Sequence, residues 1–345
     1  MNIYLPNGYL NVPLVMRPLY TNPFTFNKII MVGSRGTGKS FGVLDELSIN
    51  HSEKYFYIRT QVSELDLMKD PELNPYNALN RLRGTDFEIV KGANNTTRSL
   101  ISGDKRVAML GALANMSKVR GMDAFEYKAL FYDEFIPEPH VRKLKKQGTA
   151  IKALFETLNR NRELEGEPPM RLIMCANSDD LNNDVLITYD VLDDLLEMRD
   201  RGLEVKDFPE RGLRLVYTLF SPIAKAKAQT ANYKGQEGSD YNRMALDNEF
   251  TAYYRGNLKS QDLKNYKPVV SITGLCIYRS KTDKTYYVTR HMSGEFPEIY
   301  GGTDFERGRF QRKYFKLLDT YYRKLIKFES AGCEIAFINL WEVKK

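Results

Sequence analysis

The stretch KIIMVGSRGTGKSFGV, residues 28–43, decides the fold of this chain. It opens on a short apolar run rich in branched side chains, which is typical of a buried strand, and it closes on a segment that favours a helix. Between the two lie Gly33, Gly36 and Gly38, and glycines let a backbone turn so that successive amide groups point into one hollow. At the start of a helix such a hollow binds anions. The stretch therefore predicts a strand, a phosphate-binding loop and a helix.

The loop itself, residues 33–40, matches the pattern G-x-x-x-x-G-K-[ST]. In this pattern the lysine reaches the outer phosphates of a nucleotide and the hydroxyl binds the accompanying Mg²⁺. Lys39 and Ser40 occupy these two positions. A chance glycine-rich turn is the alternative, and the flanking strand and helix count against it. We therefore expect nucleotide binding by the loop residues Gly33, Ser34, Arg35, Gly36, Thr37, Gly38, Lys39 and Ser40.

Two adjacent carboxylates follow another apolar strand in KALFYDEFI, residues 128–136. The apolar run 129–132 ends in Asp133 and Glu134, as expected at the carboxyl edge of a nucleotide-binding sheet. Asp133 is suited to the Mg²⁺ shell, and Glu134 to orienting and deprotonating a water that attacks the terminal phosphate. A solvated loop is the alternative. A carboxylate that activates water indicates hydrolysis rather than a small-molecule kinase, whose acceptor is a substrate hydroxyl.

Three further side chains are candidates for the same reaction. MRLIMCANS, residues 170–178, indicates a strand ending in Asn177, which is placed to sense the terminal phosphate, although a strand-end Asn also serves as a turn former. ETLNRNREL, residues 156–164, puts Arg160 and Arg162 on or beside a helix. Either guanidinium is a candidate for stabilising transition-state charge in a neighbouring subunit's site. The alternative for both is a solvated helix face.

A basic run lies between the two carboxylates and these arginines. HVRKLKKQG, residues 140–148, contains no acid and four cations, Arg142, Lys143, Lys145 and Lys146. Such a run can follow a DNA backbone, where contacts to phosphates give affinity that does not depend on sequence. A simple exposed loop is the alternative.

Composition limits the class of protein. A chain of 345 residues with 42% apolar content is long enough for two globular domains. It has no apolar run of about 18 residues, and residues 1–24 lack a basic start followed by an apolar block, so we expect neither a membrane anchor nor a signal peptide, and a cytosolic location. Cys175, Cys276 and Cys333 are too few and too scattered for a disulfide framework or a zinc site. We expect them to be core residues.

The net charge is concentrated near the C-terminus. It is +7 in total, and residues 256–345 hold 17 Lys and Arg against 10 Asp and Glu, which accounts for the whole excess. The densest part is RGRFQRKYFKLLDTYYRKLIK, residues 307–327. This pattern predicts an amphipathic helix that is either simply solvated or faces a polyanion. Helical spacing places five of its side chains on one stripe: Phe310, Tyr314, Leu317, Tyr321 and Leu325.

The chain as a whole alternates between strand-like and helix-like segments, which predicts a mainly parallel sheet. KYFYIRT, residues 54–60, fits the second strand, and residues 87–113 fit short strands joined by turns at 92–95 and 103–104. The polar stretch ANYKGQEGSDYNR predicts a flexible linker. We therefore expect a nucleotide-binding domain, a linker or lid subdomain and a basic C-terminal domain, at residues 1–200, 201–255 and 256–345.

Taken together, these segments resemble a known family. The order GSRGTGKS, FYIR, LFYDEF, LNRNRE, MCANS and MALDNEF is similar to that of the DNA-packaging (encapsidation) ATPases of phi-29-like tailed bacteriophages, over most of the chain. Arg35 inside the phosphate loop is a trait of viral packaging motors. VRGMDAFEYKALFYDE also resembles the Arg-Gly segment before the acidic strand of large terminase subunits.

The resemblance implies an α/β fold, with a P-loop NTPase domain of the additional-strand, catalytic-glutamate type and a smaller RNase H-like (vestigial nuclease) α+β domain. It implies ATP and Mg²⁺ as cofactors, double-stranded DNA as substrate, and a homo-oligomeric ring, a pentamer in the family, that docks transiently from the host bacterial cytoplasm on the portal (connector) protein of the procapsid. It leaves open whether a packaging RNA takes part. By matching positions, Lys39 and Ser40 hold phosphate and magnesium, Asp133 is the metal ligand, and the catalytic residues are Glu134 as base, Arg160 as trans-acting finger, Asn177 as sensor and Arg35.

The C-terminal domain departs from an active nuclease of that kind. KPVVSITGLCIYRSKTDKTYYVTRH, residues 267–291, is a plausible hairpin of the RNase H-like fold, yet its expected first strand, residues 269–278, contains no carboxylate. Two-metal chemistry needs several converging acids, and Asp283 falls in the turn instead. We expect a non-cleaving module that docks or grips DNA. Two alternatives stay open: a packaging ATPase that also cuts DNA, and a nucleotide-gated DNA-binding protein that does not hydrolyse ATP.

Overall fold

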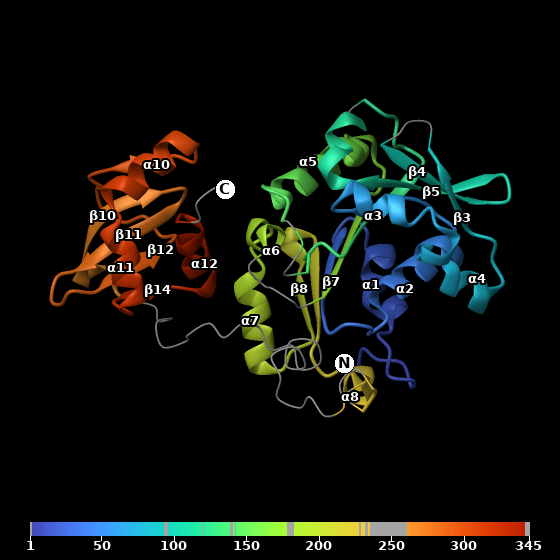
Figure 1. Ribbon diagram of the computed structural model, residues 1–345, viewed down its shortest axis with the longest axis horizontal. Helices are drawn as coiled ribbons and strands as arrows, with labels where there is room; N and C mark the ends of the chain where they lie inside the picture. The colour runs from blue at the N-terminus through green and yellow to red at the C-terminus, as the bar shows by residue number, and fades with distance from the viewer. Residues whose placement is uncertain are drawn as a thin grey trace. The chain divides into compact units, whose positions relative to one another are not determined.

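The protein consists of two compact units, Met1–Thr251 and Ala252–Lys345, in the computed structural model (Figure 1). The structure describes residues 2–92, 96–119, 121–138, 141, 143–177, 183–227, 229–231, 234 and 261–341. The MALDNEF segment, residue Arg142 and most of the predicted flexible linker lie outside these ranges.

A nine-stranded sheet forms the centre of the first unit, in the order β3-β4-β5-β2-β6-β7-β1-β9-β8. The six strands from β5 to β9 in this order pair in parallel, and the edges add antiparallel pairs. This confirms the predicted mainly parallel sheet. The strands are β1 (Lys28–Gly33), β2 (Lys54–Arg59), β3 (Glu88–Lys91), β4 (Thr97–Ser102), β5 (Lys105–Ala112), β6 (Tyr127–Asp133), β7 (Arg171–Asn177), β8 (Val205–Phe208) and β9 (Leu213–Thr218).

Helices cover both faces of this sheet, which is why its central strands are apolar on both sides. In Figure 1, α1 and α2 lie on one face and α6 and α7 on the other. The helices are α1 (Val12–Thr21), α2 (Lys39–Asp45), α3 (Val62–Leu67), α4 (Asn77–Arg83), α5 (Gln147–Asn159), α6 (Asp184–Thr188), α7 (Leu192–Arg201) and α8 (Pro222–Lys227). A π-helical turn, Glu46–Asn50, extends α2, and short 3-10 turns occupy Pro71–Leu73, Leu113–Val119, Arg162–Glu165 and Pro209–Arg211.

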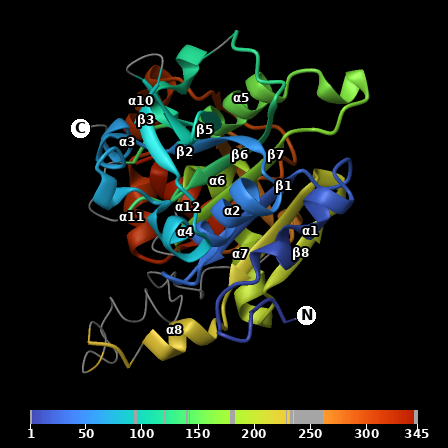
Figure 2. The same ribbon diagram turned by 90° about the vertical axis from the view of Figure 1, so that its right-hand side faces the viewer.

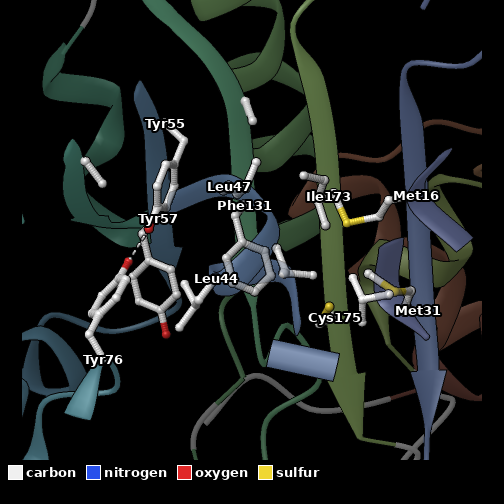
Figure 3. Packing of buried hydrophobic residues seen from close by; sticks show 14 of the residues in the cluster. Met16, Met31, Leu44, Leu47, Tyr55, Tyr57, Tyr76, Phe131, Ile173 and Cys175 are labelled. Atoms are coloured by element: carbon white, nitrogen blue, oxygen red, sulfur yellow. Dashed lines mark hydrogen bonds between the residues drawn. The ribbon is translucent and has the colours of Figure 1, made fainter. Parts of the chain in front are cut away.

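The larger core lies between the sheet and α1, α2 and α4. Figure 3 shows Phe131 of β6 pointing toward Leu44 and Leu47. Aromatic side chains of β2 lie on one side of Phe131, and strand β7 lies on its other side. The rings of Phe131 and Tyr57 meet edge to face with centroids 5.4 Å apart. This packing fixes β6 between its neighbours, and β6 ends at the acidic pair.

The second unit has its own mixed five-stranded sheet, in the order β13-β10-β11-β12-β14, and its own apolar core. Its strands are β10 (Tyr266–Ile272), β11 (Leu275–Ser280), β12 (Tyr286–Thr289), β13 (Ile299–Tyr300) and β14 (Ile326–Phe328). A 3-10 turn, Leu263–Asn265, precedes the sheet, and its helices are α10 (Asp304–Lys313), α11 (Lys316–Tyr322) and α12 (Ala331–Asn339). The three cysteines of the chain are buried and free, which confirms the expectation that they are core residues.

The structure differs from the predicted domain boundary at residue 200. Strand β9 pairs in parallel with β1, and β8 pairs with β9, so residues 205–218 are part of the main sheet rather than of a separate linker subdomain. Strand-like residues beyond 200 have their backbone partners in this sheet, which local sequence does not reveal. The predicted start of the last domain, residue 256, lies outside the described residues.

Two predictions about the second unit are wrong. The single helix expected over 307–327 is divided into α10 and α11, because the chain turns at Tyr314, the C-cap of α10. The single strand expected over 269–278 is the hairpin of β10 and β11, because Thr273 and Gly274 both have positive φ (49° and 81°) and form a two-residue turn. Four of the predicted stripe side chains still pack in or against the core, while Leu325 is 36% exposed.

Replacing Phe131 tests how firmly the core holds β6. The Phe131→Ala variant removes a fully buried ring and is expected to lower the free energy of unfolding by about 3–5 kcal/mol. Phe24→Ala is the matched control, because Phe24 is 66% exposed and its loss should cost less than about 0.5 kcal/mol. Urea unfolding followed by far-UV circular dichroism measures both variants. Equal losses in the two variants would contradict the packing described.

Candidate functional site

The phosphate loop joins β1 to α2, as the sequence predicts. β1 ends at Gly33 and α2 begins at Lys39, and Gly36 and Gly38 between them have φ of +68° and +88°. A Cβ at Gly33 would lie 1.9 Å from Oγ1 of Thr218, so the neighbouring strand β9 also requires glycine here. Glycine is therefore required in this loop for two reasons: the positive φ values within the loop, and the close approach of the neighbouring strand at Gly33.

Lys39 lies with its ammonium group inside the loop. Its side chain is buried, and Nζ donates hydrogen bonds to the carbonyl oxygens of Gly33 at 3.1 Å and Ser34 at 2.8 Å and to Oγ1 of Thr37 at 3.2 Å. The cation is thus encircled by the loop that the motif assigns to phosphate. A backbone hollow with a buried ammonium fits the phosphate chain of a nucleotide.

Asp133 and Ser40, the two residues predicted to bind Mg²⁺, are in direct contact. Ser40 Oγ donates to Asp133 Oδ1 at 2.7 Å, although the two residues lie on different elements. Tyr57 OH donates to the other carboxylate oxygen at 3.0 Å. Burial raises the pKa of Asp133, and the Arg59 guanidinium and the hydroxyls act in the opposite direction. A carboxylate and a hydroxyl beside a phosphate loop are the oxygen ligands that Mg²⁺ prefers.

Arg59, at the end of β2, holds the predicted catalytic base. Its guanidinium forms ion pairs with Glu134 Oε2, with Glu64 Oε1 at 2.9 Å and with Asp133 Oδ2 at 3.5 Å. The Arg59 side chain is only 12% exposed, whereas that of Glu134 is 49% exposed. Glu134 also has a φ of +51°, an unusual backbone conformation for a residue with a side chain. In this arrangement the Glu134 carboxylate is paired with a cation.

Sequence reasoning missed Tyr57, Arg59 and Glu64. The segment FYIR includes two of them, but it was read only as a strand and as part of a resemblance. Their importance depends on β2 lying directly beside β6 in the sheet, with Ile58 opposite Tyr132. A polar residue at the end of an apolar run, the signal that singles out Asp133 and Asn177, could have found Arg59, whereas no local signal marks Tyr57 or Glu64.

Glu134, Arg35 and Asn177 share one cavity of about 190 Å³. Asn177 ends β7 directly beside Gly33 in the register of the sheet. Arg35 Nη1 pairs with Glu138 Oε1 at 2.9 Å. The structure therefore brings these three predicted catalytic residues together, in a cavity lined by Arg35, Thr60, Gln61, Glu64, Glu134, Ile136, Pro137, Glu138, Val141 and Asn177.

The two arginines near the end of α5 lie elsewhere. Arg162 is buried and donates to the carbonyl oxygens of residues 124, 125 and 127 at 2.7–2.9 Å. These carbonyls precede or begin β6, at the opposite end of that strand from Asp133, and burial lowers the pKa of Arg162. Arg160 is exposed and donates to the carbonyl oxygen of Met122 at 2.6 Å. Since a seven-residue strand is about 20 Å long, neither arginine is placed to serve the acid pair of its own subunit.

The predicted DNA-contacting run is partly described. Lys143, Lys145 and Lys146 are exposed, and Arg142 lies outside the described residues. The three lysines precede Gln147, where α5 begins, and follow the acid pair along the chain. Along the chain, the three lysines therefore lie between the acid pair and α5.

Comparison with known proteins identifies the architecture. No family model matches the chain, and no curated protein does. Among solved structures, the bacteriophage Phi-29 viral genome packaging motor assembly covers 99% of this chain and 99% of its own, with a TM-score of 0.65 and 14% identity. The Phi-28 gp11 DNA packaging motor covers 96% and 98%, with a TM-score of 0.59 and 16% identity. The chain has the packaging-motor fold. The predicted fold class, an α/β P-loop NTPase domain with a smaller second domain, is thereby confirmed.

Within the packaging-motor fold, the described residues contain no group of three or more His, Cys, Asp or Glu side chains that could hold a metal ion. Asp283, the acid of the expected nuclease hairpin, lies in the exposed turn after β11 and accepts from the backbone N–H of Thr285 at 2.8 Å. No helix among the described residues has the length and apolar character needed to cross a membrane.

Removing the Arg59 charge should destabilise the protein in a pH-dependent way. Without Arg59, the pKa of the buried Asp133 should rise further above its unfolded value near 3.9, so the Arg59→Met variant should lose about 3 kcal/mol at pH 8. A raised pKa of Asp133 in the folded state lowers stability only at pH values where this carboxylate is charged. The stability lost by Arg59→Met should therefore shrink as the pH falls. Urea unfolding between pH 5 and pH 8 measures it, with Arg59→Lys as the charge-retaining control. A deficit that does not vary with pH would rule out this coupling.

Proposed function

We propose that this protein is an ATP-driven motor that translocates double-stranded viral DNA into a preformed capsid through the portal. The observation that supports it most directly is the hydrogen bond between Ser40 and Asp133, beside a phosphate loop and next to Glu134. These are the parts of an ATP-hydrolysing site, and they occur in a chain with the packaging-motor fold over nearly its whole length.

Nucleotide binding requires little of this chain beyond what the loop already provides. The loop amides and the Lys39 ammonium would bind the phosphate chain, and Ser40 and Asp133 would hold Mg²⁺. When bound, Mg²⁺ neutralises charge on the phosphates. The hydroxyl and carboxylate that would be its ligands are 2.7 Å apart, close enough to bind one ion. The proposed cofactors are therefore ATP and Mg²⁺.

Hydrolysis requires Glu134 to leave Arg59. A carboxylate that is paired with a guanidinium is a weak proton acceptor, because its negative charge is already balanced. Once released, Glu134 can orient a water in the cavity that it shares with Arg35 and Asn177. In this scheme Asn177, next to Gly33 on β7, contacts the terminal phosphate, and Arg35 balances its charge.

The finger for each site comes from a neighbouring subunit in a ring. Arg160 is the better candidate of the two arginines, because its side chain is exposed and lies at the far end of β6 from its own acid pair. Arg162 is buried and occupied by three backbone carbonyls, which suits a structural role. Only a neighbouring copy could bring Arg160 to the phosphate loop, so the ring is part of the mechanism.

The basic segments and the ring each have a proposed binding partner. The exposed cations Lys143, Lys145 and Lys146, with Arg142, contact the DNA backbone, and the basic second unit docks or grips nucleic acid without cleaving it. The ring, a pentamer by resemblance, docks transiently on the portal protein from the host cytoplasm. The resemblance to motors that use a packaging RNA leaves that partner open.

Two substitutions separate binding from hydrolysis. Glu134→Gln is expected to bind ATP as the wild type does and to lose at least about a hundredfold in hydrolysis, because it cannot accept a proton. Lys39→Ala is expected to lose both. Fluorescence titration with an ATP analogue and a phosphate-release assay measure the two properties. Near-normal turnover in Glu134→Gln would remove this carboxylate from the mechanism, and wild type that binds ATP without releasing phosphate would favour a nucleotide-gated DNA-binding protein.

Mixing two inactive variants tests the trans role of Arg160. Arg160→Ala should bind ATP but hydrolyse it about 10³-fold more slowly, and mixing it with Glu134→Gln should restore part of the rate, since some interfaces then join an intact Arg160 to an intact Glu134. Rates are measured on each variant alone and on the mixture, under conditions where assembly is shown by light scattering. If Arg160 only bonds to the carbonyl of Met122 in its own subunit, Arg160→Ala alone stays active. Co-assembly without rescue would also contradict the trans assignment.

A further inference from the structure

A second lysine lies on the phosphate loop. Lys227 is the last residue of α8, and its Nζ donates to the carbonyl oxygen of Arg35 at 3.2 Å. Its side chain is half-buried. Arg35 is in the middle of the loop, so this ammonium reaches the phosphate site from a helix that the nucleotide motif does not include and that lies more than 180 residues further along the chain.

The glycine at position 36 makes this approach possible. A Cβ built on Gly36 would lie 1.8 Å from Nζ of Lys227 and 2.8 Å from its Cε. Any side chain at this position would therefore displace the ammonium. The Lys227 ammonium therefore lies directly against the loop backbone at Gly36.

The N-terminal segment holds α8 in this place. The backbone N–H of Leu10 donates to the carbonyl oxygen of Thr37 in the loop at 2.9 Å. A Cβ at Gly8 would lie 3.1 Å from Cβ of Pro222, at the start of α8. Both Figure 1 and Figure 2 show α8 beside the N-terminus. The position of Lys227 thus follows from the packing of α8 and the N-terminal turn, rather than from one long side chain.

The described residues place no opposite charge beside the Lys227 cation. Within the described part of the chain no carboxylate lies at ion-pair distance from Lys227, and its hydrogen bond is to a neutral carbonyl. By contrast, Arg35 in the same loop is paired with Glu138. An ammonium has three donors, so one carbonyl leaves it free to bind an anion. A half-buried cation is costly unless an anion accompanies it, and the loop beside it is built for one.

We propose that Lys227 is a nucleotide-binding residue, whose ammonium leaves the carbonyl of Arg35 to bind the phosphate chain of a nucleoside di- or triphosphate held in the loop. This inference rests on the proposed function, because it takes the loop as the nucleotide site. Lys227 adds a ligand from outside the strand–loop–helix motif.

Affinity measurements on the full chain test this proposal. Calorimetric titration with Mg-ATP and Mg-ADP is expected to show about tenfold weaker binding, or more, for both Lys227→Ala and Lys227→Gln. Glutamine can still donate to the carbonyl of Arg35 but has no charge, so it separates a structural contact from an electrostatic one. Lys225→Ala is the matched control, because Lys225 is an exposed lysine of the same helix and should bind as the wild type does.

Labelling of the wild-type protein provides a second readout that needs no variant to fold. Mg-ATP should protect Lys227 from an amine-reactive reagent and leave Lys225 unprotected, as quantified by mass spectrometry. Two results would overturn the inference: wild-type affinity in Lys227→Gln, or labelling of Lys227 that nucleotide does not change. If Lys39→Ala still abolishes nucleotide binding, either result leaves the proposed function standing. A wild-type protein that binds no nucleotide overturns the proposed function together with the inference.

Discussion

The hydrogen bond from Ser40 to Asp133 joins the two halves of the site, and it depends on the parallel order of the sheet. Ser40 follows β1 and Asp133 ends β6, and only β7 lies between these strands. Parallel strands end at the same edge of a sheet. The phosphate loop, the acid pair and Asn177 therefore meet at that edge, although they are far apart in the sequence. An antiparallel strand at any of these positions would send its terminal side chain to the other edge.

The same contact involves a carboxylate that is buried away from water. Asp133 is buried, and a carboxylate in that position keeps its charge only with partners, which are Ser40, Tyr57 and Arg59. Arg59 in turn pairs with Glu134, so the proposed metal ligand and the proposed base share one cation. A change in the charge near Asp133, such as the arrival of a metal ion, therefore alters how strongly Arg59 holds Glu134. In the proposed function, metal binding and activation of Glu134 are thus coupled through the Arg59 guanidinium.

Local sequence patterns predict the individual elements of this site. The contacts that depend on which strands lie side by side could not be predicted from them. The loop, the acid pair and Asn177 each follow an apolar strand, and the glycines and strand ends are visible in a short window. Arg59 was missed because its role depends on β2 lying beside β6. Residues 205–218 were assigned to a linker because β8 and β9 have their partners far away in sequence. The helix over 307–327 was predicted as continuous because the stripe of apolar residues persists across the break at Tyr314.

One mechanical connection links the two ends of the first unit. Gln147 begins α5 and is buried, and its amide donates to the carbonyl oxygen of Phe135 at 2.6 Å, directly after Glu134. Arg160 follows the last residue of α5. A helix of 13 residues is about 20 Å long, so α5 connects the residue that follows Glu134 with Arg160. In the proposed ring, release of Glu134 in one site would then reposition the Arg160 finger that the same subunit offers to the next, which would order hydrolysis without a separate signalling element.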